Sequence, residues 1–218
     1  ELGSELSRIN QDAHQTPCPI SPEMNEVLQL ALLLSTKTNG MYDISIAAEL
    51  VKNGALPDHN FNSNSTANWH DIELTDDSIF FRQPLLLDLG GIAKGYAVDC
   101  AFDSLGQLPE HAGVTIIAGG DLRMNSWNDE QVGVRVPQDG RGSLSIKEIP
   151  MQNAAMASSS WYFHDGDHTI LSPDNKKPIR DKRSVTVFAD SCMLADALTK
   201  VVFLAANFQE VLTSFNAK

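Results

Sequence analysis

The sequence has 218 residues, of which 42% are hydrophobic and 20% are charged, so it can bury a full-sized core and reads as one globular domain. Its 28 acidic and 16 basic side chains give a formal net charge of −12, which repels nucleic acid and excludes it as an expected partner. The sequence contains no run of 18 apolar residues, and Cys18, Cys100 and Cys192 have neither disulfide nor zinc spacing.

The first clear element is a helix over residues 22–38. Ser21 is a typical N-cap and Pro22 suits the first helical position. Apolar residues then recur at helical spacing, and Asn39-Gly40 predicts the end of the helix. A short apolar stretch follows, and residues 53–69 read as a polar loop.

The remaining sequence combines many strand signals with few helices. We expect one helix after the glycine pair at 90–91 and a second over residues 192–206, begun by Asp190 and Ser191. The expected strands cover residues 72–74, 78–82, 85–88, 114–118, 132–136, 143–146, 154–157, 169–171 and 184–188. This pattern predicts an α+β fold with a largely antiparallel sheet.

The most informative segment is residues 85–99, where an apolar strand signal runs into Gly90-Gly91 and then a helix. Glycines let the backbone turn, and the N–H groups of the first helical turn attract anions, to which Lys94 adds a full charge. Asp88, just before the turn, suits a hydroxyl, an amide or a metal-bound water. The segment predicts a phosphate-binding turn, although an ordinary strand-to-helix turn fits the same residues. It lacks the third glycine of a dinucleotide fingerprint and the Gly-Lys-Ser/Thr of a P-loop.

A second glycine pair, Gly119-Gly120, ends the apolar strand signal at 116–118 and precedes Asp121. Glycines at a strand end allow a flat ring or a ribose to approach the backbone closely. A tight turn or a β-bulge is the alternative interpretation of the same pair.

Residues 88–99, with the sequence Asp-Leu-Gly-Gly-Ile-Ala-Lys-Gly-Tyr-Ala-Val-Asp, resemble the signature of the ApbE-like FAD:protein FMN transferases, formerly called thiamine biosynthesis lipoproteins. Further matches follow the family's order at residues 4–10, 39–43, 118–123, 132–134, 157–159 and 194–198. The resemblance implies a single ApbE-like, T-fold-type domain over residues 1–218. It also implies that an N-terminal piece and a last C-terminal strand lie outside this sequence.

The same resemblance implies an activity. FMN would be moved from FAD onto a Thr or Ser of an acceptor flavoprotein, which is protein flavinylation, with release of AMP. The alternatives are a pyrophosphatase that converts FAD into FMN and AMP, and a non-catalytic FAD-binding relative. The family's setting implies a place in the periplasm or at the periplasmic face of the inner membrane, through a lipoprotein anchor that this sequence does not include.

The resemblance and the chemistry of this sequence together assign residues to the site. Lys94, Asp196 and Lys200 are the expected catalytic residues, because they would neutralise charge that develops during phosphoryl transfer. Asp196 and Asp88 are the candidate bases for the acceptor hydroxyl. Cofactor-binding residues are expected at Met41, Tyr42, Asp43, Asp88, Lys94, Gly119, Gly120, Asp121, Ser158, Ser159 and Ile170.

The implied Mg²⁺ site departs from the family pattern. Relatives hold the metal with an Asp, here Asp196, and a Thr four residues on, where this sequence has Lys200. Because Mg²⁺ takes oxygen ligands, an ammonium cannot ligate it. Either Lys200 replaces the metal as the positive charge beside the FAD pyrophosphate, or Thr199 shifts in to ligate, or the metal is lost with the activity. The carbonyls of Gly91 and Thr199 remain candidate ligands beside Asp196.

Two smaller departures concern the cofactor site. Ser160 stands where the family has Gly, and Ser172 stands where it has the acid of a His-x-x-Asp-Pro motif. With the proline fixing the register, His168 lies one residue too far upstream and Ile170 is expected to line the cofactor.

Overall fold

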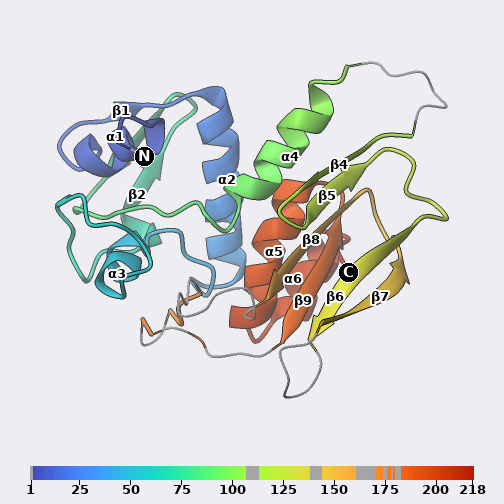
Figure 1. Cartoon of the computed structure of the whole chain (residues 1–218). Helices are drawn as coiled ribbons and strands as arrows, with labels where there is room; N and C mark the ends of the chain where they lie inside the picture. Colours follow the sequence, from blue (N-terminus) through green and yellow to red (C-terminus); the bar gives the residue numbers. More distant parts are fainter. Residues whose placement is uncertain are drawn as a thin grey trace. The chain divides into compact units, whose positions relative to one another are not determined.

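The computed structural model describes residues 2–106, 113–137, 144–160, 170–173, 176–177, 179 and 183–218 (Figure 1). The chain forms two compact units. The first consists of Glu1–Leu89 with Asp167–Ile179, and the second of Gly90–Gly166 with Arg180–Lys218. Helices accompany sheets in which all strand pairs are antiparallel, so the predicted α+β class is confirmed. That residues 1–218 make up one domain stays a prediction.

The first unit combines helices with a three-stranded sheet of order β1-β3-β2. Its elements are α1 (Glu5–Asp12), β1 (Cys18–Pro19), α2 (Pro22–Lys37), α3 (Ala47–Lys52), the 3₁₀ helix η1 (Trp69–Asp71), β2 (Ile72–Leu74) and β3 (Ser78–Phe81). Leu28 and Leu34 of α2 are fully buried, as is Ile79 of β3. Within the described residues, no helix is both long enough and apolar enough to cross a bilayer.

Helix α2 forms as its flanking residues predict. The Ser21 hydroxyl accepts a hydrogen bond from the Met24 amide at 3.1 Å, which caps the first turn. The helix ends where Asn39 and Gly40 take left-handed conformations, with φ of 50° and 79°. Helix α3 was not predicted, because the residue at its N-cap position, Ile46, offers no capping side chain.

The prediction of a strand over residues 85–88 is wrong. Leu85 and Leu87 are buried, but the backbone of this segment pairs with isolated groups rather than with a neighbouring strand. The side-chain amide of Asn10 donates to the Leu87 carbonyl at 3.0 Å and accepts from the Leu87 N–H at 2.8 Å. The Asp88 N–H donates to the Ile44 carbonyl at 2.8 Å. An extended apolar segment therefore satisfies its backbone without joining a sheet.

The second unit contains a four-stranded sheet of order β4-β5-β8-β9 and a separate hairpin of β6 and β7. Its elements are α4 (Ala93–Asp103), β4 (Thr115–Ala118), β5 (Asp121–Met124), β6 (Gln131–Pro137), β7 (Leu144–Pro150), β8 (Ala155–Ser160), β9 (Ser184–Ala189), α5 (Cys192–Leu204) and α6 (Phe208–Ser214). Strand β5 and helix α6 were not predicted. Of the strand expected at 169–171, Thr169 lies outside the described residues, and Leu171 makes a single bridge.

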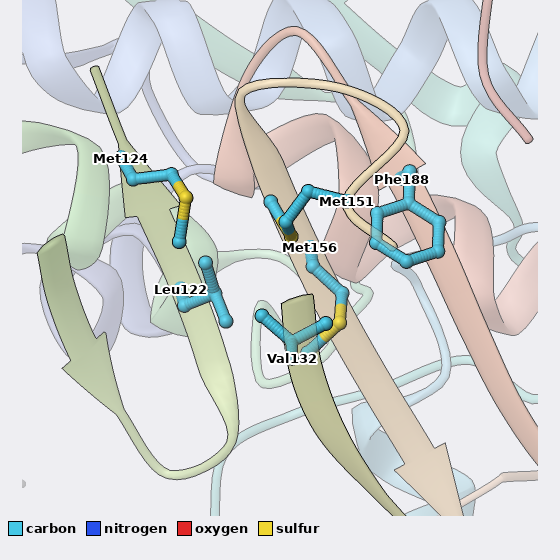
Figure 2. Close-up of a cluster of buried hydrophobic side chains, with 6 residues drawn as sticks. All are labelled: Leu122, Met124, Val132, Met151, Met156 and Phe188. Carbon is cyan, nitrogen blue, oxygen red and sulfur yellow. The ribbon is translucent and has the colours of Figure 1, made fainter. Parts of the chain in front are cut away.

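The two faces of the four-stranded sheet differ in chemistry. One face carries Leu122, Met156 and Phe188, which pack with Val132 of β6 in a closed apolar cluster (Figure 2). The other face carries Ala155, which packs against α4 and α5. Because side chains alternate along a strand, Asp121 of β5 and Ser159 of β8 fall on this second face. Asp121 and Ser159 therefore face helices α4 and α5.

Helices α4 and α5 are joined through residues of the 88–99 motif. A Cβ at Gly95 would lie 2.2 Å from the Cys192 carbonyl oxygen, so only glycine permits this approach of the two backbones. The buried Asp99 carboxylate accepts hydrogen bonds from the Cys192 and Met193 amides at 2.9 and 2.8 Å. Arg123 Nη1 donates to the same carboxylate at 3.1 Å. A carboxylate from α4 thus stabilises the N-terminus of α5.

The substitution Gly95→Ala tests this contact. Helix propensity alone would favour Ala by about 1 kcal/mol. We expect instead a loss of about 1–3 kcal/mol or more in the free energy of unfolding, because the methyl group overlaps backbone atoms that cannot move aside. Urea denaturation measures the change. Gly113→Ala is the control, since a Cβ there meets no atom within 4 Å. Equal midpoints for the two variants would contradict the contact.

Candidate functional site

The candidate site of the second unit is centred on the carboxylate of Asp196 in α5, which is 1% exposed. The ammonium group of Lys94 lies 3.1 and 2.9 Å from its two oxygens and also donates to the Gly90 carbonyl at 3.2 Å. The Gly95 amide, in the first turn of α4, donates to Asp196 Oδ2 at 3.3 Å. The helix N-terminus that was predicted to attract a phosphate is therefore directed at an anion of the chain itself.

Lys200 provides a second ammonium group. It lies one turn after Asp196 on α5 and donates both to Asp196 Oδ1 and, at 3.1 Å, to the Asp196 carbonyl. Its side chain is only 15% exposed and runs beside Gly91, where a Cβ would lie 3.3 Å from Lys200 Cε. The Asp196 oxygens thus accept four hydrogen bonds in all, which fills the roughly four acceptor positions of a carboxylate.

These contacts set the ionisation of the three groups. Burial would raise the pKa of Asp196, but the charges of Lys200 and Lys94 outweigh it and hold the pKa below its ordinary value of 3.8. Burial lowers the pKa of Lys200, and the nearby Asp196 opposes that shift. Burial would also lower the pKa of Lys94, but Asp196 and Asp121 outweigh it and raise the pKa. Asp196 is therefore a poor base, although the sequence made it a candidate.

Asp121 is a second buried carboxylate, 1% exposed, at the start of β5. Its Oδ2 lies 3.7 Å from Lys94 Nζ and makes no hydrogen bond. Burial and the charge of Asp196 raise the pKa of Asp121 to about 6. The structure thus brings Asp121 together with the three predicted catalytic residues.

The two serines predicted to bind the cofactor, Ser158 and Ser159, lie on opposite faces of the sheet. Ser159 Oγ shares a hydrogen bond of 2.7 Å with the hydroxyl of Thr199, which also donates to the Asp196 carbonyl at 2.7 Å. Ser158 points the other way, and its hydroxyl pairs with Thr186 at 2.8 Å. Strand alternation therefore places Ser159, and not the Ser158 side chain, on the face of Asp196.

Gly119 and Gly120 form the two-residue turn between β4 and β5. Ala118 pairs with Asp121 across the turn, and both glycines have positive φ, of 62° and 98°. Two successive left-handed residues are the requirement of the hairpin turn that matches strand twist. The tight-turn interpretation is confirmed, and contact of these glycines with a cofactor stays a prediction.

The residues predicted to hold Mg²⁺ do not fit the ion. Both Asp196 oxygens are bonded to ammonium groups, the Thr199 hydroxyl is bonded to Ser159, and Gly91 lies against the Lys200 side chain. In the part of the chain that the structure describes, no group of three or more His, Cys, Asp or Glu side chains could hold a metal. Mg²⁺ needs about six oxygen ligands, so it would have to displace both lysines.

The first unit contains a cavity of about 460 Å³, within the range of small-molecule sites. Gly40, Met41 and Asp43 line it from the turn after α2, together with residues 171–173. Asp43 accepts hydrogen bonds from the Ser45 amide and hydroxyl at 2.8 and 2.7 Å, and burial raises its pKa. Two of the three predicted contacts at 41–43 therefore face this cavity.

The other predicted cofactor residues lie elsewhere. Tyr42 is 5% exposed in the core, where its amide donates to the Thr38 hydroxyl at 2.9 Å. The carbonyl of Ile170 accepts from the Ile179 amide at 2.9 Å, and it is the following residues that line the cavity. His168 lies outside the described residues.

Sequence reasoning missed Trp69 and His70, which line the cavity. Their rings are stacked with centroids 3.7 Å apart, and a Cβ at Gly40 would lie 2.7 Å from Trp69 Nε1. The only sequence signal was an aromatic pair at the end of a polar loop, flanked by the capping residues Asn68 and Asp71.

The raised pKa of Asp121 predicts a pH-dependent stability. A carboxyl group whose pKa is about 6 when folded, against about 3.9 when unfolded, holds its proton more tightly in the folded state. Its contribution to stability therefore falls as pH rises from about 4 to about 6 and is constant above. Relative to wild type, Asp121→Asn should gain up to about 3 kcal/mol between pH 4 and pH 7.

Urea denaturation across this pH range checks the Asp121 prediction. The exposed Asp76→Asn controls for the same substitution at a site without burial. A difference between Asp121→Asn and wild type that does not change with pH would contradict the assigned environment of Asp121.

Comparison with known proteins supports the family resemblance seen in the sequence. Residues 1–216 match the model of the ApbE family. The FAD:protein FMN transferase of Chlamydia trachomatis is 26% identical over 236 residues, covering 99% of this chain and 73% of that protein. The FAD:protein FMN transferase of Vibrio cholerae is 30% identical over 226 residues, covering 89% of this chain and 64% of that protein. The chain thus spans about two thirds to three quarters of the length of these relatives.

Solved structures share the fold. The flavin transferase ApbE from Vibrio cholerae superposes with a TM-score of 0.81 at 26% identity, covering 98% of this chain and 75% of that one. The ApbE protein from Thermotoga maritima, at 24% identity, has the same fold with a TM-score of 0.74 and the same coverage. Because the family model matches nearly the whole length of this chain, the chain belongs to the ApbE family.

Proposed function

We propose that this chain binds FAD and transfers its FMN part to a Thr or Ser hydroxyl of an acceptor protein, releasing AMP. The observation that carries the proposal is the pair of ammonium groups, Lys94 and Lys200, gathered at the N-terminus of α4 around Asp196. The names of the relatives, FAD:protein FMN transferase, support the same reaction.

The cluster suits a phosphate because one of its cations is accessible. The side chain of Lys94 is 53% exposed, whereas that of Lys200 is 15% exposed. Lys94 can therefore contact a bound pyrophosphate while Asp196 holds its ammonium in place. In a chain of net charge −12, such a local cation is needed to attract a polyanionic substrate.

In the proposed reaction, the acceptor hydroxyl oxygen attacks the phosphorus of the FMN half of FAD. The bond from that phosphorus to the bridging oxygen breaks, AMP leaves with the oxygen, and the hydroxyl proton passes to a base. Negative charge develops on the leaving oxygen, which Lys94 would neutralise. Asp196, ionised and fully hydrogen-bonded, would orient Lys94 rather than take the proton. That Asp88 acts as the base stays a prediction from the sequence.

The cavity of the first unit, taken by itself, is proposed to hold a flat heterocycle such as the ring of a flavin. Aromatic rings stack favourably on planar ligands, and Trp69 and His70 supply two such rings. Met41 adds a polarizable thioether, and Asp43 adds hydrogen-bond acceptors at the same cavity.

The partner and the place of the reaction rest on the family resemblance. We propose an acceptor flavoprotein of electron transfer, exported or bound to a membrane, with a Thr or Ser at the modified position. We place the reaction in the periplasm or at the periplasmic face of the inner membrane. Fractionation of cells with an antibody to this chain tests the location.

Transfer is tested by incubating the chain with FAD and a Thr-containing acceptor. In-gel fluorescence detects covalent FMN on the acceptor, and chromatography detects free FMN and AMP. Lys94→Met should slow transfer about 100- to 1,000-fold, because the transition state loses a charged donor. Lys147→Met, an exposed lysine on β7, is the matched control and should leave the rate unchanged.

Each result of this assay is interpretable. A fluorescent acceptor with AMP supports the transferase. Free FMN with AMP and no labelled acceptor would identify a pyrophosphatase instead. FAD that stays intact under every condition would contradict both activities.

The role of the cavity is tested with Gly40→Ala. The added methyl would lie 2.7 Å from Trp69 Nε1 and force the indole to move, so FAD binding should weaken by roughly tenfold or more. Quenching of flavin fluorescence measures the affinity. Gly54→Ala is a close control, because Gly54 has a similar φ of 76° but meets no atom within 4 Å. Equal affinities for the two variants would contradict a ligand at this cavity.

A further inference from the structure

We infer that the Lys200 ammonium is a built-in cation at Asp196, which takes the place of a divalent metal ion and makes this position independent of Mg²⁺. The inference concerns the cation that Asp196 binds, and it stands whether or not FAD is the substrate. Only its use beside a pyrophosphate rests on the proposed function.

The first support is the state of the Asp196 carboxylate. Its oxygens accept from Lys94, from Lys200 and from the Gly95 amide, so no acceptor position is left for a metal ion. The Lys200 ammonium also donates to the Asp196 carbonyl at 3.1 Å. Carbonyl and carboxylate oxygens are the ligands that Mg²⁺ prefers, and here one ammonium contacts both.

The second support is burial. The lysine–acid pair of Lys52 and Glu49 on α3 has a 2.8 Å contact, but its lysine side chain is 56% exposed. The side chains of Lys200 and Asp196 are only 15% and 1% exposed. Surface pairs contribute little to stability, whereas a buried charge needs a partner. The buried Asp196 carboxylate requires cations, and two lysine side chains of the same protein provide them.

The third support is the packing of the Lys200 chain. Its methylene groups lie against Gly91, where a Cβ would be 3.3 Å from Cε and 3.6 Å from Cδ. Gly91 was one of the two residues, with Thr199, predicted to offer a carbonyl to the metal. The Lys200 side chain therefore occupies the space between the predicted ligands, held by α5 and unable to dissociate as a bound ion would.

The substitution Lys200→Thr reverses this arrangement, since it removes the ammonium and adds a hydroxyl oxygen one turn after Asp196. Mn²⁺, which shares the preference of Mg²⁺ for octahedral oxygen sites, reports binding by electron paramagnetic resonance. The titration uses the chelator-treated chain without flavin. Lys200→Thr should bind Mn²⁺ roughly tenfold or more tightly than wild type, a size of change common at metal sites.

Two further variants separate the effects. Lys200→Met removes the charge without adding an oxygen and should bind Mn²⁺ more weakly than Lys200→Thr. Lys52→Thr makes the same exchange in the exposed pair with Glu49 and should bind no more Mn²⁺ than wild type. Wild-type binding as tight as that of Lys200→Thr would overturn the inference.

A second measurement uses the wild-type chain alone, in case Lys200→Thr does not fold. Its melting temperature should be the same in chelator and in millimolar Mg²⁺, because a ligand stabilises only a protein that binds it. A rise in Mg²⁺ that Asp196→Asn abolishes would overturn the inference, because the ion would then bind at this carboxylate beside Lys200. Neither the Mn²⁺ titration nor the melting measurement includes FAD, so the outcomes of both are independent of the transfer assay.

Discussion

The Asp196 carboxylate, 1% exposed and bonded to two ammonium groups, is the constraint around which the second unit is arranged. A buried carboxylate is costly unless it is paired and hydrogen-bonded. Lys94 and the Gly95 amide satisfy it only because α4 approaches α5 closely, and a side chain at Gly95 would prevent that approach. Asp99 ties the same helices together by capping α5. The site and the helix contact are therefore one structural feature.

This pairing also gives the residues of the site different chemical roles. With a lowered pKa and filled acceptor positions, Asp196 suits orientation and not proton transfer. Lys94, half exposed, is the group placed to meet a ligand, while Lys200 is the enclosed cation. Asp121 completes the cluster with an oxygen that makes no hydrogen bond and with a pKa of about 6. The arrangement concentrates cations for phosphoryl chemistry in an acidic protein.

Local patterns predicted the parts of the fold that local physics decides. The N-cap Ser21 and the left-handed Gly40 bound α2 because capping and φ preferences act within a few residues. The predicted strand at 85–88 failed because its partner is a side chain 77 residues away, that of Asn10. The family resemblance assigned Lys94 and Asp196 to one site, whereas the only signal for Trp69 was its place beside His70 at the end of a polar loop. Long-range contacts of this kind are encoded by packing rather than by spacing.

The most direct test of the account is the titration of the Asp196 carboxyl carbon by ¹³C nuclear magnetic resonance, over the pH range in which the chain stays folded. The Asp196→Asn variant assigns the signal by its loss. If two ammonium groups hold the carboxylate, its chemical shift should remain that of the ionised acid at and below pH 3.8, the ordinary pKa of the group. A midpoint above 3.8 would contradict the account, because burial would then prevail over the two lysines.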